Sequence, residues 1–254
     1  MRHLSFVGSA TTRSGRGLAT RRIFRTFLLL TTLSFASAAG AAGDPIRIDT
    51  RGPDGPGPVG SGAFGEPNAA TMGQTFVAPA NALQLDRFTF FLAYGGDAAV
   101  RNPPAGPARF AGYVTAWDGS KASGPLLFAS GETQLTTPIE TPNTFTPVSF
   151  ETGGIALTPG RSYIAFLSAS GFFDGLEDNT GSAFEGDTYA GGITVSLPNG
   201  NDFSQVFTSA WLTGLAPGDR GFVAEFSPVP EPSTIMLVGT ALAAVARRRK
   251  RKNQ

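Results

Sequence analysis

Apolar and polar residues alternate along the middle of the chain, between Thr71 and Phe226. In an extended strand, successive side chains point to opposite faces, so a period of two predicts strands with one apolar face. In one such run we expect Ile193, Val195 and Leu197 to share the buried face. The clearest runs are Phe88 to Leu92, Phe110 to Trp117, Tyr163 to Ser168, Ile193 to Leu197 and Phe222 to Phe226.

Short turn sequences separate these runs at close intervals. They are Asp118-Gly119, Gly153-Gly154, Pro159-Gly160, Pro198-Asn199-Gly200 and Pro217-Gly218. The body shows no convincing apolar stripe with the 3.6-residue period of a helix. Many short strands with almost no helix predict an all-β fold. We expect an antiparallel β-sandwich of two sheets in a jelly-roll-like form.

The first 43 residues have the pattern of a signal peptide. Basic residues end at Arg25, and 18 uncharged residues follow, from Thr26 to Gly43. The alternative is a first transmembrane helix, but the Ser, Thr, Ala and Gly content after Leu33 makes this stretch weakly apolar. We therefore expect a signal helix that is removed on export. The pair Arg21-Arg22 leaves both the Sec and the twin-arginine routes open.

Residues 44–70 are rich in proline and glycine. Proline lacks the N–H that a strand ladder needs, and glycine is entropically costly to order. We expect a loose lead-in here, with a short strand at Ile46–Asp49. The β domain itself is placed at residues 71–228.

Charge divides the chain into two basic ends and an acidic body. Between Asp44 and Pro230 there are 8 basic and 18 acidic residues, which gives a net charge of 8 − 18 = −10. Nucleic-acid binding depends on clustered Lys and Arg, so the body is not expected to bind nucleic acid.

The chain has no cysteine, and its one histidine, His3, falls in the predicted signal peptide. A mature body without these residues cannot form a Ser-His-Asp or Cys-His triad. It also lacks the nitrogen and sulfur ligands that zinc usually takes in proteins. We therefore expect no enzyme of these classes and no resident cofactor.

The C-terminal 26 residues, 229–254, combine three features in a fixed order. Pro230-Glu231-Pro232 is followed by an apolar run that ends at Ala246, and a basic cluster closes the chain. As a helix, the 14 residues from Ser233 to Ala246 would extend about 21 Å, which is short for a bilayer core of about 30 Å. The basic residues act as a cytoplasmic stop; they are Arg247, Arg248, Arg249, Lys250, Arg251 and Lys252.

This tail resembles the PEP-CTERM sorting signal, which has a Pro-Glu-Pro motif, a short transmembrane helix and a basic end. The resemblance implies that an exosortase recognises Pro230, Glu231 and Pro232 and cuts the chain near them. It also implies an inner-membrane intermediate, followed by release to the cell surface or extracellular matrix of a Gram-negative bacterium. Such proteins are often associated with exopolysaccharide. The alternative is an ordinary C-terminal membrane anchor.

Four segments of the body resemble uncharacterised β-rich domains that are often joined to this tail, and the first two carry glycine. They are Gly73-Gln74-Thr75-Phe76 and the glycine-rich stretch from Gly186 to Gly192. The strand Tyr113–Trp117 and the segment Gly124-Pro125-Leu126-Leu127 belong to the same resemblance. It implies no particular activity.

Carboxylates are densest between Asp174 and Asp187. Oxygen ligands on a glycine-rich loop are what Ca²⁺ prefers, so Asp174, Asp178 and Asp187 are the candidate calcium ligands. The spacing does not match an EF-hand loop. A solvated acidic loop is the competing interpretation.

Aromatic residues on strands provide a second candidate site. Trp117 and Trp211 are the candidates for stacking against a sugar, whereas a place in the hydrophobic core is the competing interpretation. We therefore expect the body to be a structural or adhesive matrix protein, with a carbohydrate-binding module as the alternative. A glycoside hydrolase that uses two carboxylates is a further alternative.

Overall fold

The computed structural model describes residues 46–51, 60–95, 105–138, 144–186, 188–214 and 218–228. The predicted signal helix in residues 1–43 and the predicted sorting segment in residues 229–254 lie outside these ranges. Within the described ranges, no helix is both long enough and apolar enough to cross a bilayer.

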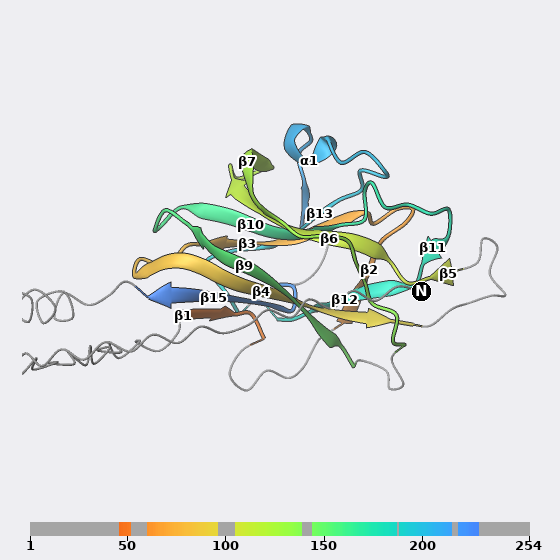
Figure 1. Cartoon of the computed structure of the whole chain (residues 1–254), viewed down its shortest axis with the longest axis horizontal. Coiled ribbons are helices and arrows are strands. Elements are labelled where there is room, and N and C mark those ends of the chain that lie inside the picture. The colour runs from red at the N-terminus through yellow and green to blue at the C-terminus, as the bar shows by residue number, and fades with distance from the viewer. Residues whose placement is uncertain are drawn as a thin grey trace, which may run out of the picture. The chain divides into compact units, whose positions relative to one another are not determined.

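Two antiparallel sheets face each other (Figure 1). The first sheet has the order β1 (Ile46–Asp49), β15 (Phe222–Pro228), β4 (Ala82–Tyr94), β12 (Thr180–Phe184), β2 (Gly60–Phe64), and β9 (Thr146–Ala156) also pairs with β4. The second has the order β14 (Leu212–Thr213), β13 (Thr194–Leu197), β3 (Thr71–Val77), β10 (Ser162–Ser168), β6 (Arg109–Trp117), β7 (Ala122–Ala129), and β8 (Thr133–Gln134) also pairs with β6.

Eight of these strands form a jelly roll. In one sheet β15 lies between β1 and β4, with β9 on β4 as well, and in the other the order is β3-β10-β6-β7. Successive strands mostly alternate between the sheets, which is the winding of a double Greek key. The expected antiparallel, jelly-roll-like β-sandwich is therefore confirmed.

An insertion of residues 169–221 separates β10 from β15. It contains β11 (Glu177–Asp178), β12, β13, α1 (Gln205–Thr208) and β14. β12 extends the first sheet and β13 extends the second, while β11 pairs in parallel with β5 (Ala105–Gly106). The insertion therefore lengthens both sheets of the jelly roll.

The core between the sheets is built from the predicted alternation. Phe88, Phe90 and Leu92 are fully buried in it. The ring of Phe76 lies within 6.1 Å of the rings of Tyr163, Phe222 and Phe226. Interlocking aromatic rings fill the space between the sheets and stabilise it through burial of apolar surface.

A second cluster, which we call the outer core, covers the opposite face of the second sheet. Ile164 and Phe166 of β10 belong to it, whereas Tyr163 and Ala165 belong to the core between the sheets. The insertion covers this face with Val206, from α1, and Trp211 (Figure 1). β10 is therefore buried on both faces, as is usual for a central strand under a covering layer.

Ile193 does not share the buried face that its spacing predicted. Val195 and Leu197 are buried in the outer core, but Ile193 is 47% exposed. β13 begins only at Thr194, so Ile193 lies before the strand and its side chain does not follow the alternation.

Two strands of the sandwich come from the stretch that was expected to be a loose lead-in. β1 matches the short strand expected at Ile46–Asp49, and β2 pairs with β12 over its whole length. Glycine serves close packing in β2, because a Cβ on Gly62 would lie 2.6 Å from the ring of Phe184. Strands from residues before Thr71 therefore belong to the sandwich as well.

The first and last strands place the two ends of the described domain together. β1 is antiparallel to β15, and Ile46 pairs with Phe226. At the end of β15, Pro228 pairs with Ala82 at the start of β4. The chain therefore enters and leaves the sandwich at the same end (Figure 1).

Candidate functional site

A group of polar side chains is buried between the sheets where the insertion rejoins the jelly roll. We call Gln74, Ser196, Asp219 and Arg220 the polar cluster. Gln74 projects from β3 on the same face as Met72 and Phe76, which belong to the core between the sheets. All but Ser196 are at least 97% buried, so their hydrogen bonds decide whether the site is stable.

Gln74 and Asp219 are held by a connected set of hydrogen bonds. Gln74 Nε2 donates to Asp219 Oδ1 at 2.7 Å, and Gln74 Oε1 accepts from the backbone N–H of Arg220 at 2.9 Å. Asp219 Oδ2 accepts from the backbone N–H groups of Thr188 at 3.2 Å and Tyr189 at 2.9 Å. One buried amide and one buried carboxylate therefore fix the end of the insertion against β3.

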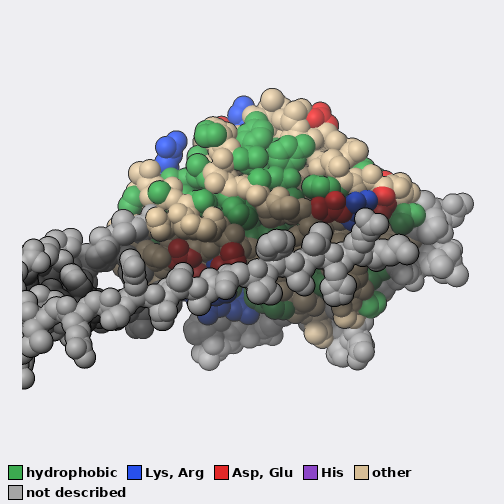
Figure 2. Space-filling view, viewed as in Figure 1, with side chains coloured by type: hydrophobic (Ala, Val, Ile, Leu, Met, Phe, Trp, Pro, Cys, Tyr) green, Lys and Arg blue, Asp and Glu red, His purple; other side chains and the backbone are tan. Residues whose placement is uncertain are grey.

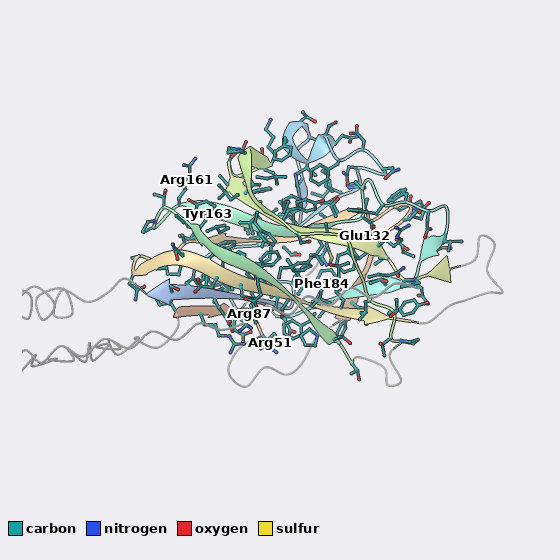
Figure 3. The ribbon with its side chains drawn as sticks, in the orientation of Figure 1. Arg51, Arg87, Glu132, Arg161, Tyr163 and Phe184 are labelled. Carbon is teal, nitrogen blue, oxygen red and sulfur yellow. The ribbon has the colours of Figure 1, made fainter. Side chains whose placement is uncertain are left out.

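Arg220 is the buried cation of the cluster. Its side chain is 3% exposed, and Nη2 donates to Ser196 Oγ at 2.9 Å. The guanidinium carbon lies 4.8 Å from the ring centroid of Phe184, which Figure 3 labels. Burial lowers the pKa of Arg220 to about 9, so the group remains protonated at neutral pH. Nε and Nη1 have no hydrogen-bond partner.

A pocket of about 320 Å³ lies beside the cluster, and we call it the β13 pocket. Thr194 of β13 and Asp219 both line it. The hydroxyl oxygen of Thr194 is buried without a hydrogen-bond partner. The remaining lining residues are Gly192, Ile193, Thr213, Gly214 and Gly218.

Trp117 and Trp211 lie together in the outer core. Their ring centroids are 5.9 Å apart in an edge-to-face arrangement, and the two side chains are 9% and 4% exposed. Trp211 Nε1 donates to the backbone carbonyl of Val206 at 3.0 Å. The structure therefore places both rings in a core, and neither presents a free face to a sugar.

Two of the three candidate calcium ligands lie near Glu66. Asp178 Oδ2 accepts from the backbone N–H of Glu66, and Glu66 Oε2 accepts from the backbone N–H of Asp174 at 3.0 Å. Asp187 is outside the described residues. In the ranges that the structure describes, no three such side chains are arranged to hold a metal ion. The carboxylates of Asp178 and Glu66 instead accept hydrogen bonds from backbone N–H groups, and these bonds hold the loop in place.

Asp178 has an unusual proton affinity. Burial raises the pKa of Asp178 to about 6, and the nearby charges of Asp174 and Glu66 act in the same direction. The hydrogen bond from Glu66 N opposes them. Between an ordinary pKa of 3.8 and about 6, the folded protein binds a proton that the unfolded chain releases. The contribution of Asp178 to stability is therefore lost as pH rises through 6.

Replacing Asp178 with Asn should stabilise the protein at pH 7 by about 1 kcal/mol, a value reduced because the group is partly exposed. The Asn oxygen still accepts from Glu66 N, while the charge is removed. Urea unfolding at pH 5 and pH 7 measures the effect, and the stability difference between these pH values should shrink in the variant. Glu151→Gln, at a side chain that is 71% exposed, is the control. Equal pH dependence in Asp178→Asn and the wild type would contradict the prediction.

Sequence reasoning did not identify Gln74, Ser196 or Arg220 as a cluster. Two segments of the resemblance described above nevertheless meet here. Gln74 belongs to the first and Thr188 to the second, and Asp219 accepts hydrogen bonds from both. A buried arginine has no local sequence pattern, so only the folded chain reveals it.

Comparison with known proteins adds evidence for the C-terminus. A family model described as the PEP-CTERM protein-sorting motif matches residues 228–251. No curated protein matches the chain. Among solved structures, the chain is similar to the cysteine protease and lectin-like domains of Cwp84, a surface layer associated protein of Clostridium difficile. That similarity has 15% identity and a TM-score of 0.38, and it covers 63% of this chain and 32% of that one.

The chain spans about a third of the Cwp84 structure. The family match covers the expected Pro230-Glu231-Pro232 motif and ends within the basic cluster, at Arg251. It begins at Pro228, the last residue of β15. The chain therefore carries the PEP-CTERM protein-sorting motif at its C-terminus, and this motif implies an exported protein that is sorted by an exosortase.

Proposed function

We propose that the β-sandwich is a structural or adhesive component of the cell surface or extracellular matrix, associated with exopolysaccharide. The observation that carries this proposal is the sorting motif, which begins where the last strand of the sandwich ends. The chain passes through an inner-membrane intermediate of a Gram-negative bacterium before an exosortase acts. The sandwich is the part that is displayed.

The surface of the sandwich supports a structural role. Among the described residues, the large apolar side chains that are exposed are aliphatic, and both tryptophans are buried. On the face shown in Figure 2, apolar side chains lie among polar ones over the second sheet. A surface of this kind offers broad contacts and has no aromatic platform for a single sugar.

A carbohydrate-binding module is the second candidate. The β13 pocket favours it, because a volume of about 320 Å³ lies in the range of small-molecule sites. Glycan-array binding by the purified chain distinguishes the two candidates. A defined oligosaccharide that binds in the pocket, and whose binding is weakened by Thr194→Val, would favour the module.

Deleting the gene in its host should reduce the exopolysaccharide that stays on washed cells, because the matrix loses a component that links to it. Restoring the wild-type gene should restore retention. A gene in which the 46–228 segment is replaced by an unrelated exported domain is the control, since it keeps both terminal signals. Unchanged retention and unchanged adhesion in the deletion strain would contradict a structural role.

A further inference from the structure

The hydroxyl group of Thr194 is buried and has no hydrogen-bond partner. Thr194 is the first residue of β13 and is 5% exposed, and no group donates to its Oγ1 atom or accepts from it. Buried hydroxyl groups almost always form a hydrogen bond, because otherwise the interaction that they lose with water is not replaced. The hydroxyl of Thr194 does not stabilise the fold in this way, and it remains available as a nucleophile.

Gln74 lies directly opposite Thr194 on the neighbouring strand. The two residues are partners in the antiparallel pair of β13 and β3, so their side chains project from the same face of the sheet. The backbone N–H of Thr75 donates to the carbonyl of Ile193 at 3.0 Å, so these two residues form a hydrogen-bonded pair. The two kinds of pair alternate, so Gln74 and Thr194 form a non-hydrogen-bonded pair, in which the Cβ atoms are about 4.5–5.5 Å apart. The Thr194 hydroxyl is therefore within reach of the Gln74 side-chain amide.

Hydrogen bonds hold both ends of the Gln74 amide. Oε1 accepts from the backbone N–H of Arg220 at 2.9 Å, and Nε2 donates to Asp219 Oδ1 at 2.7 Å. A donor at this distance from a carbonyl oxygen stabilises the negative charge that develops on the oxygen when a nucleophile attacks the carbon. A carboxylate in contact with the amide nitrogen can transfer a proton to it. The Gln74 amide therefore has the partners that acyl transfer to a hydroxyl requires.

We propose that Thr194 and Gln74 form an intramolecular ester, which covalently joins β13 to β3. In this step Thr194 Oγ1 forms a bond to Gln74 Cδ, the Cδ–Nε2 bond breaks, and one molecule of ammonia is released. Asp219 lines the β13 pocket together with Thr194, and its carboxylate takes the hydroxyl proton and passes it to the leaving nitrogen. No atom changes its oxidation state, so no further reactant is needed. The ammonia leaves through the β13 pocket.

An ester at this place fastens the insertion to the jelly roll. It joins two residues that lie more than 100 positions apart in the chain. A covalent link between distant residues stabilises a fold chiefly by lowering the conformational entropy of the unfolded chain. Disulfides have this effect in many exported proteins, but this chain has no cysteine. The ester does not depend on the matrix function proposed above, because its formation is measured on the purified protein alone.

The test is mass spectrometry of the full chain, purified in detergent and digested with trypsin under denaturing conditions. Trypsin cuts after Lys and Arg, so Gln74 falls in the peptide of residues 52–87 and Thr194 in the peptide of residues 162–220. The ester should join these two peptides, and the joined mass should be lower than their sum by one ammonia. Hydroxylamine, which cleaves esters, should separate the two peptides.

Thr194→Val keeps the shape of the side chain and removes the nucleophile. Its two peptides should therefore be recovered separately, with the masses that the sequence gives. This variant should also melt about 10 °C below the wild type, because the covalent link is lost. Thr194→Ser keeps a hydroxyl at the same position and should keep the linked peptides. If Thr194→Val does not fold, the wild-type peptides and those of Thr194→Ser decide the test.

Thr213→Val is the matched control, because Thr213 is an exposed threonine that lines the same pocket from β14. It should keep the linked peptides and the melting temperature of the wild type. The proposal is overturned if the two wild-type peptides are recovered separately and unmodified. It is also overturned if the ammonia is lost within the peptide of residues 162–220 alone, since Asn199-Gly200 can lose ammonia by forming a succinimide.

Discussion

Replacing Glu231 with Ala should stop the protein from reaching the cell surface. Glu231 is the charged centre of the motif matched by the sorting family, and a side chain without a carboxylate cannot make the contacts that distinguish this motif. The chain should then remain in the inner membrane with its basic tail, including Lys252, intact. Fractionation followed by mass spectrometry of the C-terminal peptide measures both results.

Glu132→Ala is a matched control for this change. Glu132 is a half-exposed carboxylate that pairs with Arg109 on the surface of the sandwich. Such pairs contribute about 0–1 kcal/mol, so the control should fold and be sorted normally. Surface-exposed protein that still carries Lys252, in the wild type or in Glu231→Ala, would be inconsistent with processing at this motif.

Replacing Phe76 with Ala should have the largest effect on stability. Phe76 is fully buried, and its ring packs against aromatic residues of both sheets, Tyr163 on one and Phe222 and Phe226 on the other. Removing a buried phenylalanine ring from a core typically costs about 3–5 kcal/mol. The free energy of unfolding of a native protein is about 5–15 kcal/mol, so the variant should lose a large share of its stability. Urea unfolding of the full chain measures the loss.

Leu127→Ala on β7 is the control, because that side chain is 36% exposed. Exposed substitutions usually change stability by less than about 0.5 kcal/mol. A loss of stability of similar size in Leu127→Ala and Phe76→Ala would contradict the assignment of the core between the sheets.

The alternation along the sequence predicted both faces of the second sheet. Phe110 and Val114 face the core between the sheets, while Tyr113 and Trp117 face the outer core. A period of two predicts which residues share a face of the sheet, because neighbouring side chains point to opposite faces. It does not predict whether another part of the chain packs over the outer face. The sequence alone therefore could not distinguish a Trp117 that stacks against a sugar from a buried one. In the structure, Trp211 packs against Trp117 in the outer core.

The sequence predicted a strand at Ile193 to Leu197, close to β13, but it could not predict how the insertion pairs with the two sheets. Its strands are short, and β12 and β13 pair with β4 and β3, whose residues lie more than 80 positions away in the chain. Long-range pairing of this kind depends on the whole fold and has no local signal. The polar cluster is a product of this pairing, since Ser196 comes from the insertion and Gln74 from β3.

The pairing of β1 with β15 brings both ends of the sandwich to one side. A partner that binds the chain at both Ile46 and Pro228 therefore contacts a single end of the domain. The opposite end, with β5, β11 and the carboxylates of Asp174 and Asp178, lies about 40 Å away along β4 (Figure 1). Residues 46–228 thus form a cassette with adjacent ends. Another domain whose first and last strands pair would likewise hold its two ends next to each other.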